Sequence, residues 1–125
     1  MLDMDHFKKV NDTLGHLIGD GVLKDVAHRI ATSVRDKDLI GRYGGEEFLL
    51  IFPETSLQVA QQVTERIRQH IASTPIHLQD QSVPITISIG LTHFNPDDTL
   101  ESLLQRADSA MYAAKQAGRN CISVL

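Results

Sequence analysis

The stretch Gly44-Gly45-Glu46-Glu47-Phe48-Leu49-Leu50-Ile51-Phe52 decides the fold, because it places a tight turn directly before an apolar run. A second strand-like segment, residues 39–43, lies on the other side of the two glycines. Two such runs separated by Gly-Gly are typical of a β-hairpin whose turn residues both adopt positive φ. The stretch therefore predicts antiparallel strands over 39–43 and 46–52 with a two-residue turn.

The remaining pattern predicts helices that cover this sheet. Apolar residues at helical spacing indicate helices over about 6–13 and 16–34, with Asp5 as the N-cap of the first. Two further long helices are expected, one after a capping box at 55–58 and one that begins near Asp98 and Glu101 and ends at Gly118. Strands are expected at 1–4, at the alternating segment 84–92 and at 121–125. The order β-α-α-β-β-α-(β)-β-α-β predicts an α+β sandwich with a central, mostly antiparallel sheet.

Composition narrows the class of protein. The chain has 125 residues, 42% of them apolar, which is enough for one domain with a proper core. A net charge of −4 and few aromatic residues argue against nucleic-acid binding. The single cysteine, the lack of a long apolar run and the lack of a secretory leader predict a cytoplasmic domain that makes no membrane contact through this segment.

The acidic residues beside the turn predict a metal site. Carboxylates on the edge of a buried strand are costly unless a cation meets them. Asp3 ends the first strand and Glu46 begins another, so the two converge if these strands are neighbours. Mg²⁺ prefers one or two carboxylates together with water and phosphate oxygens. Glu47 points to the opposite face from Glu46, and a solvated charge is the simpler interpretation for it, as helix capping is for Asp5.

Two further clusters suit a nucleotide. Asn11 and Asp20 offer the acceptor and donor groups that match a guanine edge, and Lys8 or Lys9 could meet a phosphate. From spacing alone, a solvated helix face is the simpler explanation of this cluster.

The second of these clusters is Lys115 and Arg119, which flank a glycine. Two cations placed in this way could hold a polyphosphate. The dipole at the end of a helix is a sufficient reason for one of the two.

Several motifs in one order resemble the GGDEF domain, the catalytic module of diguanylate cyclases. The match covers nearly the whole chain. It rests on Asp3-Met4-Asp5-His6-Phe7-Lys8, on Asn11-Asp12 continuing to Gly19-Asp20, on Arg42-Tyr43-Gly44-Gly45-Glu46-Glu47-Phe48, on Ile87-Ser88-Ile89-Gly90, and on Ala107-Asp108 through Met111-Tyr112 to Lys115, Gly118, Arg119 and Asn120.

The resemblance implies a palm-like nucleotidyl cyclase fold and a reaction in which two GTP molecules condense into cyclic di-GMP with release of pyrophosphate. Two Mg²⁺ or Mn²⁺ ions per active site are implied. The resemblance assigns metal binding to Asp3, the Met4 carbonyl, Glu46 and Glu47, and catalysis to Glu46, Glu47 and Lys8. It assigns substrate binding to Phe7, Lys8, Asn11, Asp20, Gly44, Gly45, Lys115 and Arg119.

Control and assembly are implied in the same way. Arg35-Asp36-Lys37-Asp38 fits the R-x-x-D pattern of the family's inhibitory product site, which Arg66 completes. Catalysis implies an antiparallel homodimer, because each domain holds one GTP and half of the reaction centre. Family members carry a D-x-L-T-x-L-x-N-R segment before the first strand. The chain starts after that point, so residues 1–125 are expected to be a GGDEF domain without its leading segment.

Two alternatives remain open from the sequence. The domain could bind GTP or cyclic di-GMP as a sensor without turnover, although Glu46 and Glu47, the two acids of the family signature at residues 42–48, are present. It could also form a mononucleotide ring, as related palm-like folds do.

Overall fold

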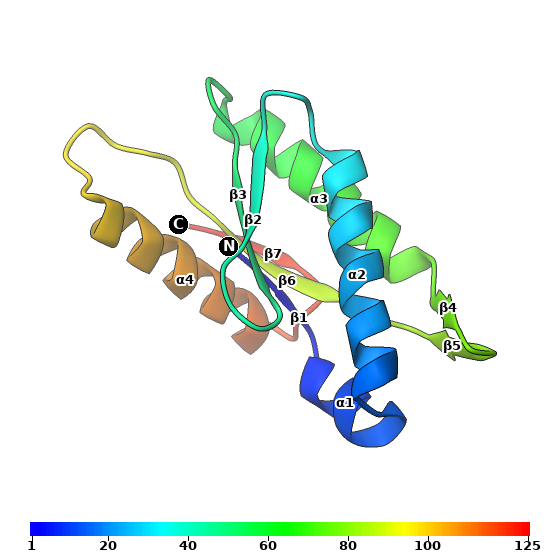
Figure 1. Ribbon diagram of the computed structural model, residues 1–125. Helices are drawn as coiled ribbons and strands as arrows, with labels where there is room; N and C mark the ends of the chain where they lie inside the picture. Colours follow the sequence, from blue (N-terminus) through cyan, green and yellow to red (C-terminus); the bar gives the residue numbers. More distant parts are fainter.

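The computed structural model describes residues 1–125, and their elements follow the predicted order with one extra strand. Figure 1 shows the sheet in the middle of the molecule, with α2 and α3 on one side and α4 on the other. The elements are β1 (Leu2–Met4), α1 (Phe7–Leu14), α2 (His16–Ser33), β2 (Leu39–Arg42), β3 (Glu47–Ile51), α3 (Leu57–Ser73), β4 (Ile76–Leu78), β5 (Gln81–Val83), β6 (Ile87–Leu91), α4 (Leu100–Gln116) and β7 (Ile122–Val124).

The main sheet has the strand order β2-β3-β1-β6-β7. All its pairs are antiparallel except β6 with β7, which confirms an α+β fold with a mostly antiparallel sheet. The short strand β1 lies at the centre, between β3 and β6. The end of β1 is therefore enclosed by neighbours on both sides.

Strands β4 and β5 form a separate hairpin at the far end of α3. Gln79 and Asp80, the two residues between them, have positive φ values of 47° and 64°. The sequence pattern indicated a single uncertain strand here, because Gln-Asp lacks the Asn-Gly signal that identifies such turns.

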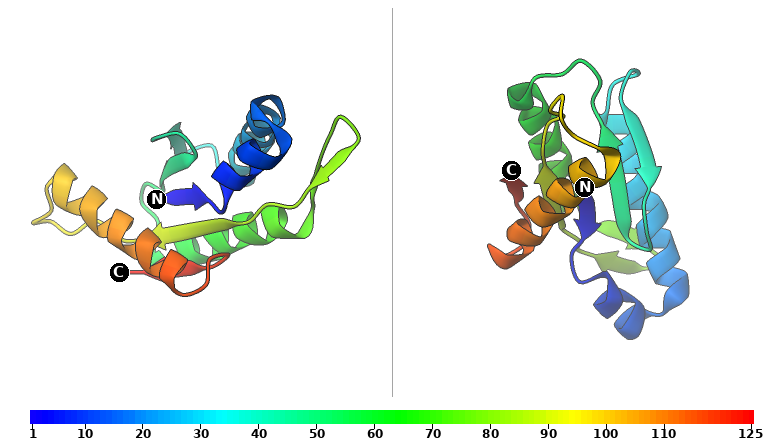
Figure 2. Two further views of the ribbon diagram at one scale, coloured as in Figure 1. Left: turned by 90° about the horizontal axis from the view of Figure 1, so that it is seen from below. Right: turned by 90° about the vertical axis from the view of Figure 1, so that its left-hand side faces the viewer.

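The two faces of the sheet carry cores of different size. Leu2, Met4 and Phe48 belong to a core of 17 buried residues that includes α2 and α3. On the other face, Met1 joins Ala107 and Met111 of α4 in a core of only three buried residues. The two views of Figure 2 show α2 and α4 on opposite sides of the sheet. Alternate residues of β1 thus point into different layers.

The residues that cap the N-termini of α3 and α4 each lie one position after the predicted residue. Ser56, rather than Thr55, caps α3 by accepting a hydrogen bond from the Val59 amide. Thr99 and Ser102 form the capping box of α4, while Asp98 forms an ion pair with Arg106. Gly118 has a φ of 116°, and the Arg119 amide donates to the Ala114 carbonyl, so the predicted glycine at the end of α4 is confirmed.

The turn between β2 and β3 is wider than predicted. β2 ends at Arg42 and β3 begins at Glu47, and neither Gly44 nor Gly45 has a positive φ. The prediction of a two-residue turn is therefore wrong. The guanidinium of Arg42 donates to the carbonyls of Gly44 and Gly45, at 2.7 Å for the shortest contact. This side chain closes the turn.

Strand β6 is shorter than predicted and is buried on both faces. The alternation over 84–92 predicted a polar outer face, yet Ser88 is fully buried. The reason lies in Asp5, whose Oδ1 accepts a hydrogen bond from the Ser88 hydroxyl at 2.6 Å. Because Ser88 is hydrogen-bonded, its burial carries little penalty.

Asp5 is not the N-cap of α1. His6 occupies that position with a φ of 55° and makes no side-chain cap. Asp5 is 3% exposed, and its Oδ2 accepts from the Thr86 hydroxyl at 2.7 Å and from the Asn120 amide at 3.0 Å. One buried carboxylate thereby joins the end of β1, β6 and the loop that leads to β7.

Helix α4 packs directly against the backbone of β6 at Gly90. A Cβ atom built on Gly90 would lie 2.1 Å from the Met111 amide nitrogen and 2.3 Å from the Ala107 carbonyl oxygen. No side chain can therefore be accommodated there without moving the helix. None of the four helices is both long and apolar enough to cross a bilayer.

We expect Gly90→Ala to lower the free energy of unfolding by about 2 kcal/mol or more, because overpacking against backbone cannot relax. Urea denaturation measures the change. Gly41→Ala is the matched control, since a Cβ there meets nothing within 4 Å. Equal effects of the two substitutions would contradict the close packing of α4.

We expect Asp5→Asn to cost about 1.5 kcal/mol or more, since an amide replaces a charged acceptor of three hydrogen bonds. Urea denaturation of both Asp5→Asn and Asp12→Asn makes the comparison. Asp12 is exposed on α1, so its substitution should be nearly neutral. A neutral Asp5→Asn variant would show that the three contacts are dispensable.

Candidate active site at the end of strand β1

The register of β1 brings the acidic residues together. Asp3 pairs with Glu47 on one side and with Ser88 on the other. Directly paired residues of antiparallel strands point to the same face, so Asp3 and Glu47 share the face that α4 covers. Glu46 lies just before β3, and its carbonyl accepts from the Met4 amide at 3.2 Å. The predicted approach of the first strand to the signature turn is confirmed, with Glu47 rather than Glu46 opposite Asp3.

Asp3 carries the most unusual environment of these acids. It is 5% exposed, and its Oδ2 forms an ion pair with the ammonium of Lys115 at 3.0 Å. Its Oδ1 is buried and accepts no hydrogen bond. Burial raises the pKa of Asp3, Lys115 opposes this rise, and the charges of Glu46 and Glu47 add to it. Both glutamates are therefore close enough to act on the same charge.

The donor set at this place fits a hard divalent ion. Asp3 has a buried oxygen without a donor, and the neighbouring Met4, Glu46 and Glu47 offer further oxygens. No three His, Cys, Asp or Glu side chains are gathered into a ready-made cage. That arrangement suits Mg²⁺, which is held by one or two carboxylates and completes its shell with water and substrate phosphates.

The residues expected to contact guanine lie on α1 and α2. Asn11 packs against Gly19, where an added Cβ would lie 1.7 Å from the Asn11 Oδ1 atom. This oxygen is buried and has no hydrogen-bond partner. Asp20 is exposed one residue further along α2. The absence of a side chain at Gly19, one residue before Asp20, thus allows α1 and α2 to approach at Asn11.

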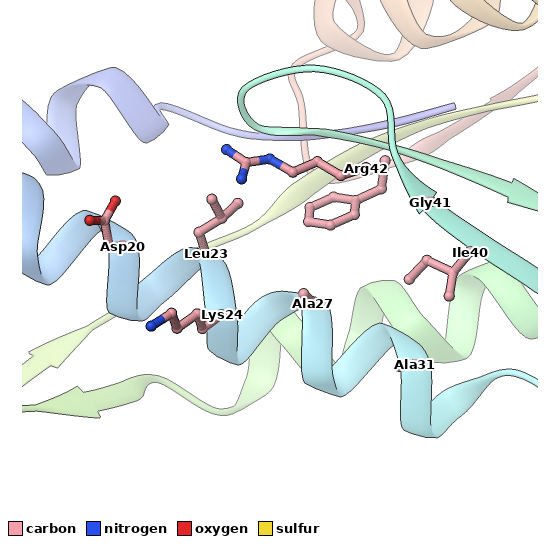
Figure 3. A pocket seen from close by; sticks show the side chains of 9 residues that line it. Asp20, Leu23, Lys24, Ala27, Ala31, Ile40, Gly41 and Arg42 are labelled. Atoms are coloured by element: carbon pink, nitrogen blue, oxygen red, sulfur yellow. The ribbon is translucent and has the colours of Figure 1, made fainter.

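A groove of about 610 Å³ begins at Asp20 and runs along α2 to β2. Figure 3 shows Asp20 and Lys24 on the helix, with the guanidinium of Arg42 opposite them. Leu23 and Ile40 contribute apolar walls. Such a mixture suits a flat ring with a polar edge. Arg42 was not among the predicted site residues, although it lies within the quoted signature and could have been found there.

Two predicted residues of α1 have contrasting positions. Lys8 is exposed in the first turn of the helix, where its ammonium can reach solvent or an anion. Phe7 is buried in the larger core, so its side chain supports the helix rather than lining the groove.

The end of α4 supplies the cations. Lys115 lies in the last turn and contacts Asp3, as described above. Arg119 is exposed, with a φ of 64°, between Gly118 and Asn120, which also have positive φ. The hydrogen bond from the Asn120 amide to Asp5 holds this loop against the end of β1. The two predicted phosphate-binding side chains therefore belong to the same end of the sheet as the acids.

The R-x-x-D residues form a separate cluster where α2 leads into β2. Arg35 donates from Nε to Oδ2 of Asp38 and from a terminal nitrogen to Oδ1, both at 3.0 Å, and also to the Thr55 hydroxyl. These hydrogen bonds hold the pKa of Asp38 below its usual range. Arg66 donates to the Ser33 carbonyl at 2.8 Å, close to the same loop.

Sequence comparison agrees with these features. The model of the family described as "Diguanylate cyclase, GGDEF domain" matches residues 1–121. The chain is 45% identical over 124 residues to diguanylate cyclase DgcP of Pseudomonas aeruginosa, covering 99% of this chain and 18% of that protein. It is 47% identical over 125 residues to response regulator PleD of Caulobacter vibrioides, covering 98% and 28% respectively. The chain thus spans less than a third of each of these relatives.

Solved structures share the fold. The GGDEF domain of DgcB from Caulobacter crescentus, in complex with c-di-GMP, has a TM-score of 0.94 and 38% identity over 98% of this chain and 74% of that one. The active GGEEF domain of a diguanylate cyclase from Vibrio cholerae has a TM-score of 0.88 and 34% identity over 98% and 78%. With the acid pair of the signature turn, the central β1 and the family match in agreement, the chain belongs to the GGDEF domain family of diguanylate cyclases.

Proposed function

We propose that the domain condenses two GTP molecules into cyclic di-GMP and releases two pyrophosphates. The observation that carries the proposal lies at the end of β1. Asp3 forms an ion pair there with the Lys115 ammonium, and the nearby charges of Glu46 and Glu47 raise the Asp3 pKa. Relatives that are named diguanylate cyclases support it, at 42–45% identity over 99% of this chain.

The chemistry needs a nucleophile and a stabilised leaving group. The 3′-hydroxyl of one GTP attacks the α-phosphorus of the other, a phosphoester bond forms, and pyrophosphate leaves. Asp3, the Met4 carbonyl, Glu46 and Glu47 would hold two Mg²⁺ or Mn²⁺ ions. When bound, these ions would lower the hydroxyl pKa and neutralise phosphate charge. Glu46 accepts the hydroxyl proton in this proposal. Lys8, Lys115 and Arg119 bind phosphate oxygens and stabilise the charge that develops on them.

Guanine, at the opposite end of the substrate from the phosphates, is recognised by residues of α1 and α2. The Asn11 amide and the Asp20 carboxylate offer complementary groups to the guanine edge, and the groove beside Asp20 is lined by apolar walls that suit the ring. Gly44 and Gly45 let the backbone of the signature turn approach the nucleotide.

The reaction requires two copies of the domain. Each copy holds one GTP, so each 3′-hydroxyl reaches the other α-phosphorus only when two domains face each other in C₂ symmetry. The product in turn would bind at the Arg35–Asp38 cluster with Arg66, where guanidinium groups match phosphate and guanine acceptors. Bound product would thus limit its own synthesis.

We expect Glu46→Gln to lower cyclic di-GMP formation by about a hundredfold or more, because the amide cannot accept the proton. Chromatographic separation of nucleotides after incubation with GTP and Mg²⁺ measures the product. Glu101→Gln, exposed on the first turn of α4, is the control and should keep full activity. Full turnover by Glu46→Gln would refute the assignment.

The same assay on the wild-type protein tests the two alternative functions. GTP that is bound but unchanged would indicate a sensor, and a mononucleotide product mass would indicate a different cyclase.

We expect Arg35→Ala to raise the cyclic di-GMP concentration needed for half inhibition by about tenfold or more, since it removes a bidentate donor. Initial rates of pyrophosphate release at increasing product concentration measure this value. Lys37→Ala, exposed between Arg35 and Asp38, is the control. Because Arg35 also holds Asp38, Arg66→Ala provides a second variant. Unchanged inhibition in both arginine variants would exclude product binding at this cluster.

A further inference from the structure

The ion pair between Asp3 and Lys115 joins a metal-binding candidate to a phosphate-binding candidate. The Lys115 ammonium lies 3.0 Å from the Asp3 carboxylate, and the two side chains are 28% and 7% exposed. Lys115 is the only cation in direct contact with Asp3 in the structure. The role proposed above for each residue requires them to separate, because Asp3 must accept the metal and Lys115 must turn to the phosphates.

We propose that Lys115 is an internal counter-ion that neutralises Asp3 in the nucleotide-free domain and leaves it only when metal and nucleotide arrive together. This inference rests on the proposed function. Its consequence is that the domain binds divalent ions weakly by itself, and that the polyphosphate promotes metal binding by giving the ammonium a new partner.

Electrostatics argue for exchange rather than simple addition. A divalent ion on Asp3 would lie within a few ångströms of the Lys115 ammonium, where like charges repel strongly because the site is partly buried. Removal of the ammonium without a replacement is also unfavourable, since it leaves a buried carboxylate uncompensated. Asp3 therefore needs one cation at all times, and either Lys115 or the metal can supply it.

The geometry of Lys115 permits the exchange. Its stem is flexible and carries a compact charge. It lies in the last turn of α4, immediately before the left-handed residues at 118–120 where Arg119 is exposed. The ammonium makes no contact besides Asp3 that would hold it in place. A phosphate bound near Arg119 would attract Lys115 without any movement of the helix backbone.

The test is Mn²⁺ binding to the full-length protein without nucleotide, followed through the electron paramagnetic resonance signal of free Mn²⁺. We expect Lys115→Met to tighten Mn²⁺ binding by roughly tenfold. A factor of about ten corresponds to the smallest change that a neighbouring opposite charge usually makes to the pKa of a carboxylate. Lys115→Arg keeps the charge and should bind Mn²⁺ as weakly as the wild type. Lys37→Met removes an exposed cation that does not touch Asp3 and should leave Mn²⁺ binding unchanged.

A second titration uses a non-hydrolysable GTP analogue. The analogue should tighten Mn²⁺ binding strongly in the wild type and much less in Lys115→Met, because coupling between two ligands is reciprocal and depends on the shared ammonium. Thermal unfolding gives an independent measure: Mn²⁺ alone should raise the melting temperature of Lys115→Met more than that of the wild type. Circular dichroism checks the fold, and Lys115→Gln replaces Lys115→Met if the latter is unfolded.

Equal Mn²⁺ affinity of wild type and Lys115→Met without nucleotide would overturn the counter-ion role, whatever the turnover of the wild type. The proposed function fails on a different result, namely a wild-type protein that binds Mn²⁺ and GTP but forms no cyclic di-GMP. The two failures are therefore distinguishable.

Discussion

The buried charge of Asp3 is the constraint around which the site is organised. A carboxylate at the centre of a five-stranded sheet is unfavourable unless a cation compensates it, and the nearest cation is Lys115 from the last turn of α4. Two more acids, Glu46 and Glu47, come close to the same point and add to the cost. The fold therefore concentrates negative charge in one place and supplies too little positive charge of its own. In the proposed function, divalent ions would supply the missing positive charge.

Four segments that are distant in sequence meet at this point, and polar contacts join them. Register joins β1 to the signature turn, the Asp3–Lys115 pair joins β1 to α4, and Asp5 joins β1 to β6 and to the loop after α4. The hydroxyls of Thr86 and Ser88 take part in the last of these contacts. Hydrogen bonds to a charged acceptor have strict geometry. They therefore position the loop that carries Arg119 more precisely than apolar packing would.

Sequence patterns predicted most elements because hydrophobic periodicity and glycine positions are local signals. The hairpin, the three long helices and the glycine at the end of α4 are of this kind. The patterns failed where a distant residue decides the outcome. Asp5 looked like a helix cap because its partners, Ser88 and Asn120, lie more than 80 residues away. The turn at Gly44-Gly45 was predicted to be tight because the rules for turn sequences do not include side-chain hydrogen bonds such as the one from Arg42 to the Gly45 carbonyl. The pairing of Asp3 with Glu47 needed the register itself.

The contact at Gly90 has a consequence for how this architecture tolerates change. Most tight spots in a protein interior can be relieved by a second substitution, in which a neighbour becomes smaller. At Gly90 the obstructing atoms are the Met111 amide nitrogen and the Ala107 carbonyl oxygen, which every amino acid at those positions would keep. A smaller side chain at either neighbour would therefore not make room for a Cβ at Gly90, and only a shift of α4 relative to β6 would do so.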